Sequence, residues 1–361
     1  RDLHSFPTRR SSDLSFAHDV ANIFYSNIGD CVINAVFYLT QHCNLACPYC
    51  YMHSSPSVEK TQIPTDDVNF YLGELKTLPN FLPGVAFAGG EIFTLPLSYI
   101  KENIENAFAQ DICIELKTNG TWAMNPERKQ SVFNMVREIN MPKHLFNIDP
   151  DILEYFISKE MTQDDKRRVR RYRLLHRGLV SRSNYMVNLA KIKYRIDLRY
   201  SPLAMGISVD NDVIHNVNVS NNAYRTVLSD VLGDDELRQK ISLGCITVVD
   251  EDDNFVPQET NMVDGYAVYV TRDTKRNPNS KNYFDGKWIQ KPLYSEKGEL
   301  IEPGRINLWF RPDRTVSLES ELNYQPIGRV SYIKNNGDYK KMPEIINDIT
   351  HQLMLDYQRL R

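Results

Sequence analysis

The sequence predicts an α/β fold of the barrel type. Short apolar segments rich in β-branched and aromatic residues, such as Val32–Thr40, alternate with segments of helical periodicity, such as Leu97–Ala109. The 361 residues are 42% hydrophobic and 25% charged, a composition typical of a folded globular protein. Polar loops with Cys, Gly and Asn follow the predicted strands, at the edge where barrel-like α/β folds build active sites.

The predicted elements follow one another in a regular order. The predicted strands are Val32–Thr40, Gly84–Ala88, Ile112–Lys117, Ile207–Asp210, Leu243–Val249 and Tyr266–Thr271, with a further short strand at His144–Ile148. The predicted helices are Thr65 to about Leu75 with Thr65 as N-cap, Leu97–Ala109, and Pro126–Ile139. The fourth strand is delayed by an insertion at 149–203. Beyond it we expect a long loop over Arg272–Pro303, a hairpin of Ile306–Phe310 with Thr315–Leu318, and a helix from Pro343.

Charge and hydropathy exclude several classes of protein. With 43 basic and 46 acidic residues, the formal charge of −3 argues against a general affinity for nucleic acid or an anionic membrane. The longest apolar run, Cys31–Leu39, is too short to span a bilayer. The first 14 residues, Arg1–Leu14, resemble the translation of a sequencing adapter and contain no secretory signal. We exclude them from functional reasoning, expect the true start to be missing, and predict a cytoplasmic protein.

Three of the six cysteines fall within eight residues, as Cys43-Asn-Leu-Ala-Cys47-Pro-Tyr-Cys50. Thiolates this close can face one metal centre. A structural zinc ion needs a fourth ligand, which would have to be His42 or His53. An iron–sulfur cluster can instead keep one iron open for a small molecule. The remaining alternative is three unliganded cysteines. The other cysteines, Cys31, Cys113 and Cys245, are isolated and are interpreted as small apolar residues.

Four motifs in order resemble those of the radical S-adenosylmethionine (radical SAM) enzymes. The first is the Cys-x3-Cys-x2-Cys loop with an aromatic residue, Tyr49, before the third cysteine. The others are Phe87-Ala-Gly-Gly-Glu91, Lys117-Thr-Asn-Gly-Thr121 and Ile207-Ser-Val-Asp210. The resemblance covers roughly residues 33–250. It implies an incomplete (β/α)6 TIM-type barrel core over 15–275 and a C-terminal extension over 276–361, a β-hairpin plus helix resembling a cysteine-free SPASM or twitch domain.

The resemblance also implies the cofactors and their binding residues. Cys43, Cys47 and Cys50 would hold one 4Fe-4S cluster, since no cysteine after Cys245 is present for a second. S-adenosyl-L-methionine (SAM) would lie near residues of all four motifs. Gly89 and Gly90 would admit a ligand close to the backbone, and Glu91 would accept a hydrogen bond from the methionyl ammonium. The remaining candidates are Tyr49, Thr118 and Asn119 near the methionine or ribose, Ser208 and Asp210 at the ribose hydroxyls, and Ile246 and Val248 at the adenine.

The expected activity is reductive cleavage of SAM to a 5′-deoxyadenosyl radical, which abstracts a hydrogen atom from a peptide or small natural product. An electron donor such as flavodoxin or ferredoxin would be a partner. The basic stretch Lys166–Arg177 leaves open a nucleotide or RNA substrate, although the acidic remainder of the chain weakens it. A third alternative is a degenerate, SAM- or cluster-binding regulator. Little chain precedes the first strand to hold a cobalamin domain.

Overall fold

The computed structural model describes residues 28–47, 50, 52–78, 80–142, 203–209, 219–247, 262–263, 266–272, 293–298, 300–302, 304–318 and 327–360. The chain divides into two compact units. The larger comprises 35–285 and 311–313, and the smaller comprises 1–34, 286–310 and 314–361. Within the described residues no helix is both long and apolar enough to cross a membrane.

The larger unit is built on a mostly parallel sheet. Its strands are β1 (Cys31–Thr40, of which 35–40 belong to this unit), β2 (Phe81–Gly89), β3 (Cys113–Thr118), β4 (Leu203–Val209), β5 (Ser242–Thr247), β7 (Tyr266–Arg272) and β6 (Met262–Val263), neighbours in that order. The pairs from β2 to β7 are parallel, and β6 pairs antiparallel with β7. In the described part of the chain the sheet is an open row, and the α/β prediction is confirmed.

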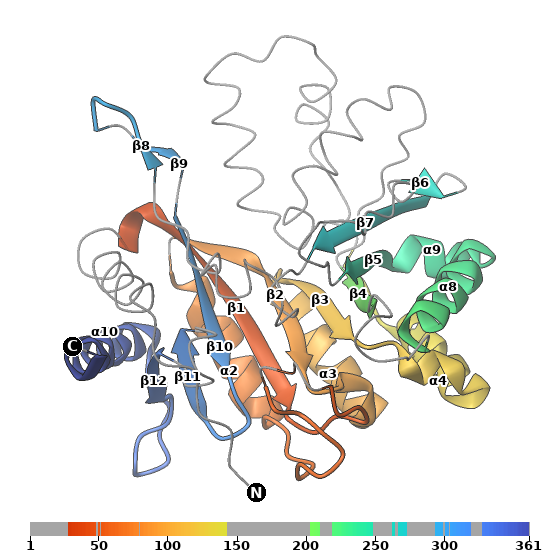
Figure 1. Cartoon of the computed structure of the whole chain (residues 1–361), viewed down its shortest axis with the longest axis horizontal. Helices are drawn as coiled ribbons and strands as arrows, with labels where there is room; N and C mark the ends of the chain where they lie inside the picture. The colour runs from red at the N-terminus through yellow and green to blue at the C-terminus, as the bar shows by residue number, and fades with distance from the viewer. Residues whose placement is uncertain are drawn as a thin grey trace, which may run out of the picture. The chain divides into compact units, whose positions relative to one another are not determined.

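Helices follow β1, β2, β3 and β4 in the chain and pack on one another (Figure 1). They are α2 (Thr65–Lys76), α3 (Leu97–Phe108), α4 (Pro126–Glu138), α8 (Val219–Leu232) and α9 (Asp235–Lys240). Contacts run from α2 to α3, α3 to α4, α4 to α9, and α9 to α8. The side chains of β1 are buried on both faces, as expected for a strand of a covered parallel sheet.

Most element boundaries agree with the sequence prediction within a few residues, and the differences have local causes. Thr65 is not an N-cap: Pro64 takes that position with a non-helical ψ of 140°, and its carbonyl accepts the Val68 N–H. The stretch Arg272–Pro303 is not only loop, because β8 (Leu293–Tyr294) and β9 (Leu300–Glu302) form an antiparallel pair. β3 pairs directly with β4 despite the long delay between them. His144–Ile148 and the basic stretch Lys166–Arg177 lie outside the described residues.

The smaller unit contains the predicted hairpin and C-terminal helix. Strands β10 (Gly304–Phe310), β11 (Thr315–Leu318) and β12 (Ile327–Ser331) are antiparallel, and α10 (Met342–Leu360) packs on β12. Gly328 makes this close packing possible, since a Cβ there would lie 3.1 Å from Ile349 and 3.2 Å from Leu353. Its N–H also donates to Asp356 of the helix.

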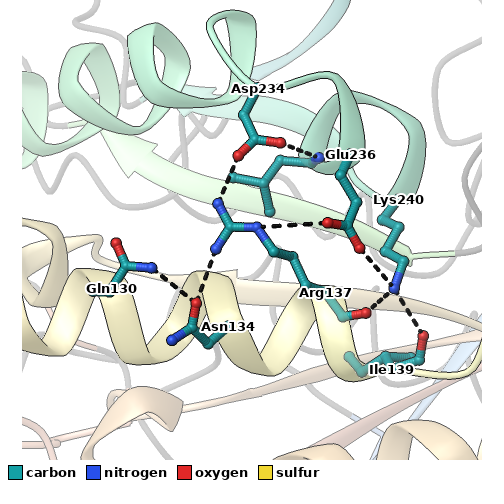
Figure 2. A network of polar contacts seen from close by, with 8 residues as sticks. Gln130, Asn134, Arg137, Ile139, Asp234, Glu236 and Lys240 are labelled. Carbon is teal, nitrogen blue, oxygen red and sulfur yellow. Dashed lines mark hydrogen bonds and ion pairs between the residues drawn. The ribbon is translucent and has the colours of Figure 1, made fainter.

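A polar network fixes α9 against α4 in the larger unit. Figure 2 shows Arg137 of α4 donating to Asp234, at 2.6 Å, with Glu236 3.9 Å away. Asp234 is also the N-cap of α9 and accepts the Leu237 N–H. Lys240 donates to the carbonyls of Arg137 and Ile139 at the end of α4. The backbone N–H of Leu237 and then the Arg137 guanidinium hold the pKa of Asp234 below its usual value.

We predict that Asp234→Asn loses less stability at pH 7 than Asp234→Ala. Asn still caps the helix and loses only the ion pair, at most about 1 kcal/mol for a partly exposed pair. Ala also loses the cap, about 1 kcal/mol more. Urea unfolding at pH 7 checks this order, and equal midpoints for the two variants would contradict it.

The pH dependence follows from the depressed pKa. The charge of Asp234 stabilises the fold above the unfolded-state pKa of about 3.9, and this contribution is lost as pH falls through the lower folded-state pKa. The stabilities of wild type and Asp234→Asn, measured by urea unfolding, should therefore begin to converge as pH falls below about 4 and become equal only below the folded-state pKa. A gap that stays constant from pH 7 to well below that pKa would contradict this.

Candidate functional site

Three of the four sequence motifs meet at the carboxyl ends of β1, β2 and β3. The backbone N–H of Gly90 donates to the carbonyl of Thr40 at 2.9 Å. The next N–H, of Glu91, donates to the carbonyl of His42, also at 2.9 Å. The Gly-Gly-Glu segment after β2 is therefore hydrogen-bonded to the segment that enters the cysteine loop after β1.

The two glycines are required by this approach of two backbones. A Cβ on Gly90 would lie 2.1 Å from the His42 carbonyl oxygen, and one on Gly89 would lie 2.2 Å from that of Thr40. Gly89 also has a φ of 144°, which disfavours any other residue. In the structure the missing side chains make room for the β1 loop. Room for a ligand at Gly89 and Gly90 stays a prediction.

Glu91 joins this assembly to the loop after β3. Its carboxylate is buried and accepts three hydrogen bonds: from the Phe93 N–H at 3.0 Å, the Thr118 hydroxyl at 2.6 Å and the Asn119 N–H at 2.7 Å. Burial raises the pKa of Glu91, and these three donors oppose the rise. The side chain thus fixes the short helix η2 (Ile92–Thr94) and the start of the Thr-Asn-Gly segment.

Two residues that the sequence did not reveal complete the surroundings of Glu91. Arg128 of α4 donates to the carbonyls of Phe93 and Leu95, and its charge lowers the pKa of Glu91. Trp122 donates its indole N–H to the Thr118 hydroxyl at 3.1 Å. Neither residue belongs to a recognisable motif. Arg128 lies on α4, and Trp122 lies in the short helix η3 (Thr121–Met124).

Thr118 has no hydrogen-bonding capacity left for a ligand. Its hydroxyl donates to Glu91 and accepts from the Gly120 N–H and from Trp122. A hydroxyl offers one donor and two acceptor sites, and all three are used. The predicted contact of Thr118 with methionine or ribose therefore cannot use this hydroxyl in the described arrangement.

Asn119 connects the third motif to the cysteine loop. Its side-chain amide nitrogen Nδ2 lies 3.0 Å from the side-chain oxygen Oδ1 of Asn44 and 3.8 Å from the Cys43 sulfur. Asn44 in turn donates to Thr121 at 2.7 Å. The sequence gave no signal for Asn44 or Thr121 beyond their places next to Cys43 and after Gly120.

None of the three cysteines of the loop is in a disulfide, and they differ in exposure. Cys43 is 7% exposed, while Cys47 and Cys50 are half-buried. The pKa of Cys43 is raised to about 12, first by burial and then by the charges of Glu91, Cys47 and Cys50, while the hydrogen bond from the Leu45 N–H opposes the rise. As they stand, no three His, Cys, Asp or Glu side chains in the described part of the chain form a group that could hold a metal ion. The metal assignment of Cys43, Cys47 and Cys50 thus remains a prediction.

The histidines of the zinc alternative are placed differently from each other. His42 is buried, and its Nδ1 lies 2.8 Å from the Val58 carbonyl oxygen. A carbonyl only accepts, so Nδ1 carries the proton and only Nε2 could bind a metal. His53 is exposed, with a positive φ of 50°, and its N–H donates to the Cys50 carbonyl. The zinc alternative stays open.

The fourth motif is only partly described. Ser208 lies half-buried near the end of β4, next to Ile207, whose register partner on β3 is Thr118. Ser208 itself is opposite Ile246 of β5. Tyr49, Asp210 and Val248 lie outside the described residues, so their predicted contacts are not placed.

Comparisons with known proteins find similarity only among solved structures. No family model and no curated protein matches the chain. A structure of anSMEcpe with bound AdoMet and the Cp18Cys peptide is 14% identical, with a TM-score of 0.40 and coverage of 91% of this chain and 84% of that one. Streptococcus suis SuiB bound to the precursor peptide SuiA is 12% identical, with a TM-score of 0.40 and coverage of 96% and 72%. HydG, a maturase of the [FeFe]-hydrogenase, is 13% identical, with a TM-score of 0.28 and coverage of 68% of this chain and 53% of that one. These TM-scores are too low to support an inference, so the function is argued from the residues.

We predict that Gly90→Ala destabilises the junction of the first two loops. The added methyl would overlap the His42 carbonyl, so the two backbones must separate and lose their hydrogen bonds, at a cost of at least about 2 kcal/mol. The matched control is Gly29→Ala, because nothing lies within 4 Å of a Cβ there. Thermal unfolding should show a clear loss for Gly90→Ala alone; equal melting temperatures would contradict the close approach.

Proposed function

We propose that the chain is a radical SAM enzyme that holds one 4Fe-4S cluster at the cysteine loop and cleaves SAM reductively. The observation that carries the proposal is the hydrogen-bonded junction of the first three motifs. Glu91 connects the second motif to the third, and Asn119 connects the third to the first. Motifs that were separate in the sequence are thus parts of one site.

The chemistry of the donor set fits an iron–sulfur cluster. Three cysteines that form no disulfide lie on one loop, and the first is buried among groups that disfavour its negative charge. A cationic metal centre favours the thiolate form. The cluster, when bound, would deliver the electron that breaks the C–S bond of SAM. The protein's part is to bind, orient and exclude competing reactions.

The residues proposed to contact SAM differ in how much hydrogen-bonding capacity their side chains have left. Glu91 accepts two hydrogen bonds at Oε1 and one at Oε2, so a methionyl ammonium could use only what is left at Oε2. We therefore assign Glu91 and Thr118 first to the scaffold. Ser208 and Asp210 remain proposed SAM contacts, as do the backbones of Gly89 and Gly90. Asn119 remains one only through groups other than its side-chain amide, which is already hydrogen-bonded to Asn44, Thr121 and Cys43.

The proposed substrate is a peptide or small natural product. This rests on the resemblance of the C-terminal hairpin and helix to the extension of peptide-modifying radical SAM enzymes. The alternative of a nucleotide or RNA rests on the basic stretch Lys166–Arg177, which has seven Lys or Arg in twelve positions. A regulator without catalysis is the alternative of another class. We further propose that the protein lies in the cytoplasm and draws electrons from a flavodoxin or ferredoxin.

The cluster assignment is tested with the triple variant of Cys43, Cys47 and Cys50 to Ala. Anaerobically reconstituted wild type should bind about four irons per chain, the number in one 4Fe-4S cluster, and release 5′-deoxyadenosine from SAM when reduced. The triple variant should lose both the cluster absorbance and SAM cleavage. The control replaces Cys31 and Cys113, which are buried and lie outside the motif, and should keep both.

Two results would overturn this assignment. A triple variant that keeps its full iron content would place the cluster elsewhere. A wild type that binds one zinc ion, stays colourless and does not cleave SAM would favour the zinc site.

The substrate class is tested by reversing Arg167, Arg168, Arg170 and Arg171 to Glu. We expect substrate-free SAM cleavage to change less than twofold, because the segment lies outside the four motifs. Binding of a labelled acidic peptide should weaken at least tenfold at low ionic strength, where exposed charges are least screened. If wild type binds single-stranded RNA but not the peptide, the nucleic-acid alternative is favoured. If wild type and the reversed variant bind the peptide with equal affinity, the basic segment plays no part in substrate binding.

A further inference from the structure

The side chains of Asn44, Asn119 and Thr121 form a closed polar ring beside the first cysteine of the motif. The side-chain amide of Asn44 donates to the Thr121 hydroxyl at 2.7 Å, and that hydroxyl donates to the side-chain oxygen Oδ1 of Asn119 at 2.7 Å. Asn119 closes the ring by donating to Asn44 at 3.0 Å. The ring spans two loops, since Asn44 follows β1 and the other two residues follow β3.

The ring fixes which end of the Asn119 amide faces the cysteine. The backbone N–H of Thr121 also contacts the Asn119 side-chain oxygen, at 3.0 Å. A backbone N–H can only donate, so this end of the amide must be the oxygen. The amide N–H2 therefore points the other way, toward Asn44 and the Cys43 sulfur 3.8 Å away.

Cys43 is the cysteine at which such a donor has most effect. It is buried, whereas the other two cysteines of the loop are half-buried. Its sulfur also accepts the Leu45 N–H at 3.4 Å. Two N–H donors thus converge on one buried sulfur, one from its own loop and one from the loop after β3. Hydrogen bonds to cluster sulfurs are among the features that set the potential of an iron–sulfur centre.

We infer that Asn119 is a positioning residue that donates to the Cys43 sulfur and raises the reduction potential of the cluster, and that Asn44 and Thr121 hold it in that orientation. The inference rests on the proposed function, since it concerns the cluster that Cys43 would ligate. Its physical basis is that an N–H donor stabilises the more negative, reduced centre more than the oxidised one. Without the donor, reduction becomes harder while the three cysteine ligands remain.

The test is a redox titration of reconstituted protein, followed by electron paramagnetic resonance and absorbance, with no SAM cleavage in the readout. Asn119→Leu removes the donor, and Asn119→Asp replaces it with a negative charge while keeping an acceptor for Thr121. We expect the equilibrium constant for one-electron reduction to fall about tenfold in Asn119→Leu, which is about 59 mV, and further in Asn119→Asp. Asn44→Ala leaves Asn119 in place but frees its amide, so the fall should have the same sign and be smaller.

Ser57→Ala is the matched control, because this exposed hydroxyl lies in the segment after the cysteine loop and its recorded contact is to Ser55, not to sulfur. It should not move the potential. Unchanged potentials in Asn119→Asp and Asn44→Ala, both with full iron and sulfide, would overturn the inference while leaving the proposed function intact. A wild type that takes up no cluster would instead overturn the proposed function, and the inference with it. If Asn119→Leu fails to fold, the other two variants decide the outcome.

Discussion

The buried carboxylate of Glu91 is the constraint on which the rest of the site depends. Taking a carboxylate out of water is costly, and the cost is offset only where donors surround it. Here the donors are the Phe93 N–H, the Thr118 hydroxyl and the Asn119 N–H, with the charge of Arg128 nearby. Because these donors come from two loops, the carboxylate can be satisfied only when both loops take their observed positions. The same hydrogen bonds that stabilise the charge therefore specify the junction of β2 and β3.

The glycines before Glu91 serve the same junction from the other side. The N–H groups of Gly90 and Glu91 reach carbonyls of the β1 loop only because no Cβ stands between the backbones. Glu91 thus lies at the centre of three strand ends, connected to the first by its backbone and to the third by its side chain. The backbone hydrogen bonds from Gly90 and Glu91 anchor the start of the cysteine loop, at Thr40 and His42. Cys47 and Cys50, farther along the loop, are half-buried.

The sequence predicted the strands and motif positions well, and the roles of motif residues less well. Strand and helix periodicity locates β1 to β5 and β7 because each is a continuous apolar or amphipathic segment between polar loops. The hairpin β10–β11 was predicted as Ile306–Phe310 with Thr315–Leu318, and the structure confirms this pair. The role of a motif residue is harder to predict than its position, because the residue type does not say which atoms its side chain contacts in the fold. Thr118 was expected at a ligand, yet its hydroxyl is fully used within the protein. Arg128 and Asn44 could not be found, since their partners lie 33–35 and 75–77 residues away.

Asn119 donates to two acceptors at once, the Glu91 carboxylate and the Cys43 sulfur. Its backbone N–H donates to Glu91, and its side-chain amide faces the Cys43 sulfur. The charge of Glu91 raises the pKa of Cys43, so the carboxylate and a thiolate disfavour each other across this gap. A cation between them would screen that repulsion, but it would also compete with a metal centre for the thiolate. An amide supplies directed donors without a net charge, so it can stabilise both anions and leave the sulfur free to bind. Asn119, in the third motif, thus lets one neutral residue donate both to the buried carboxylate of the second motif and to the first cysteine of the first motif.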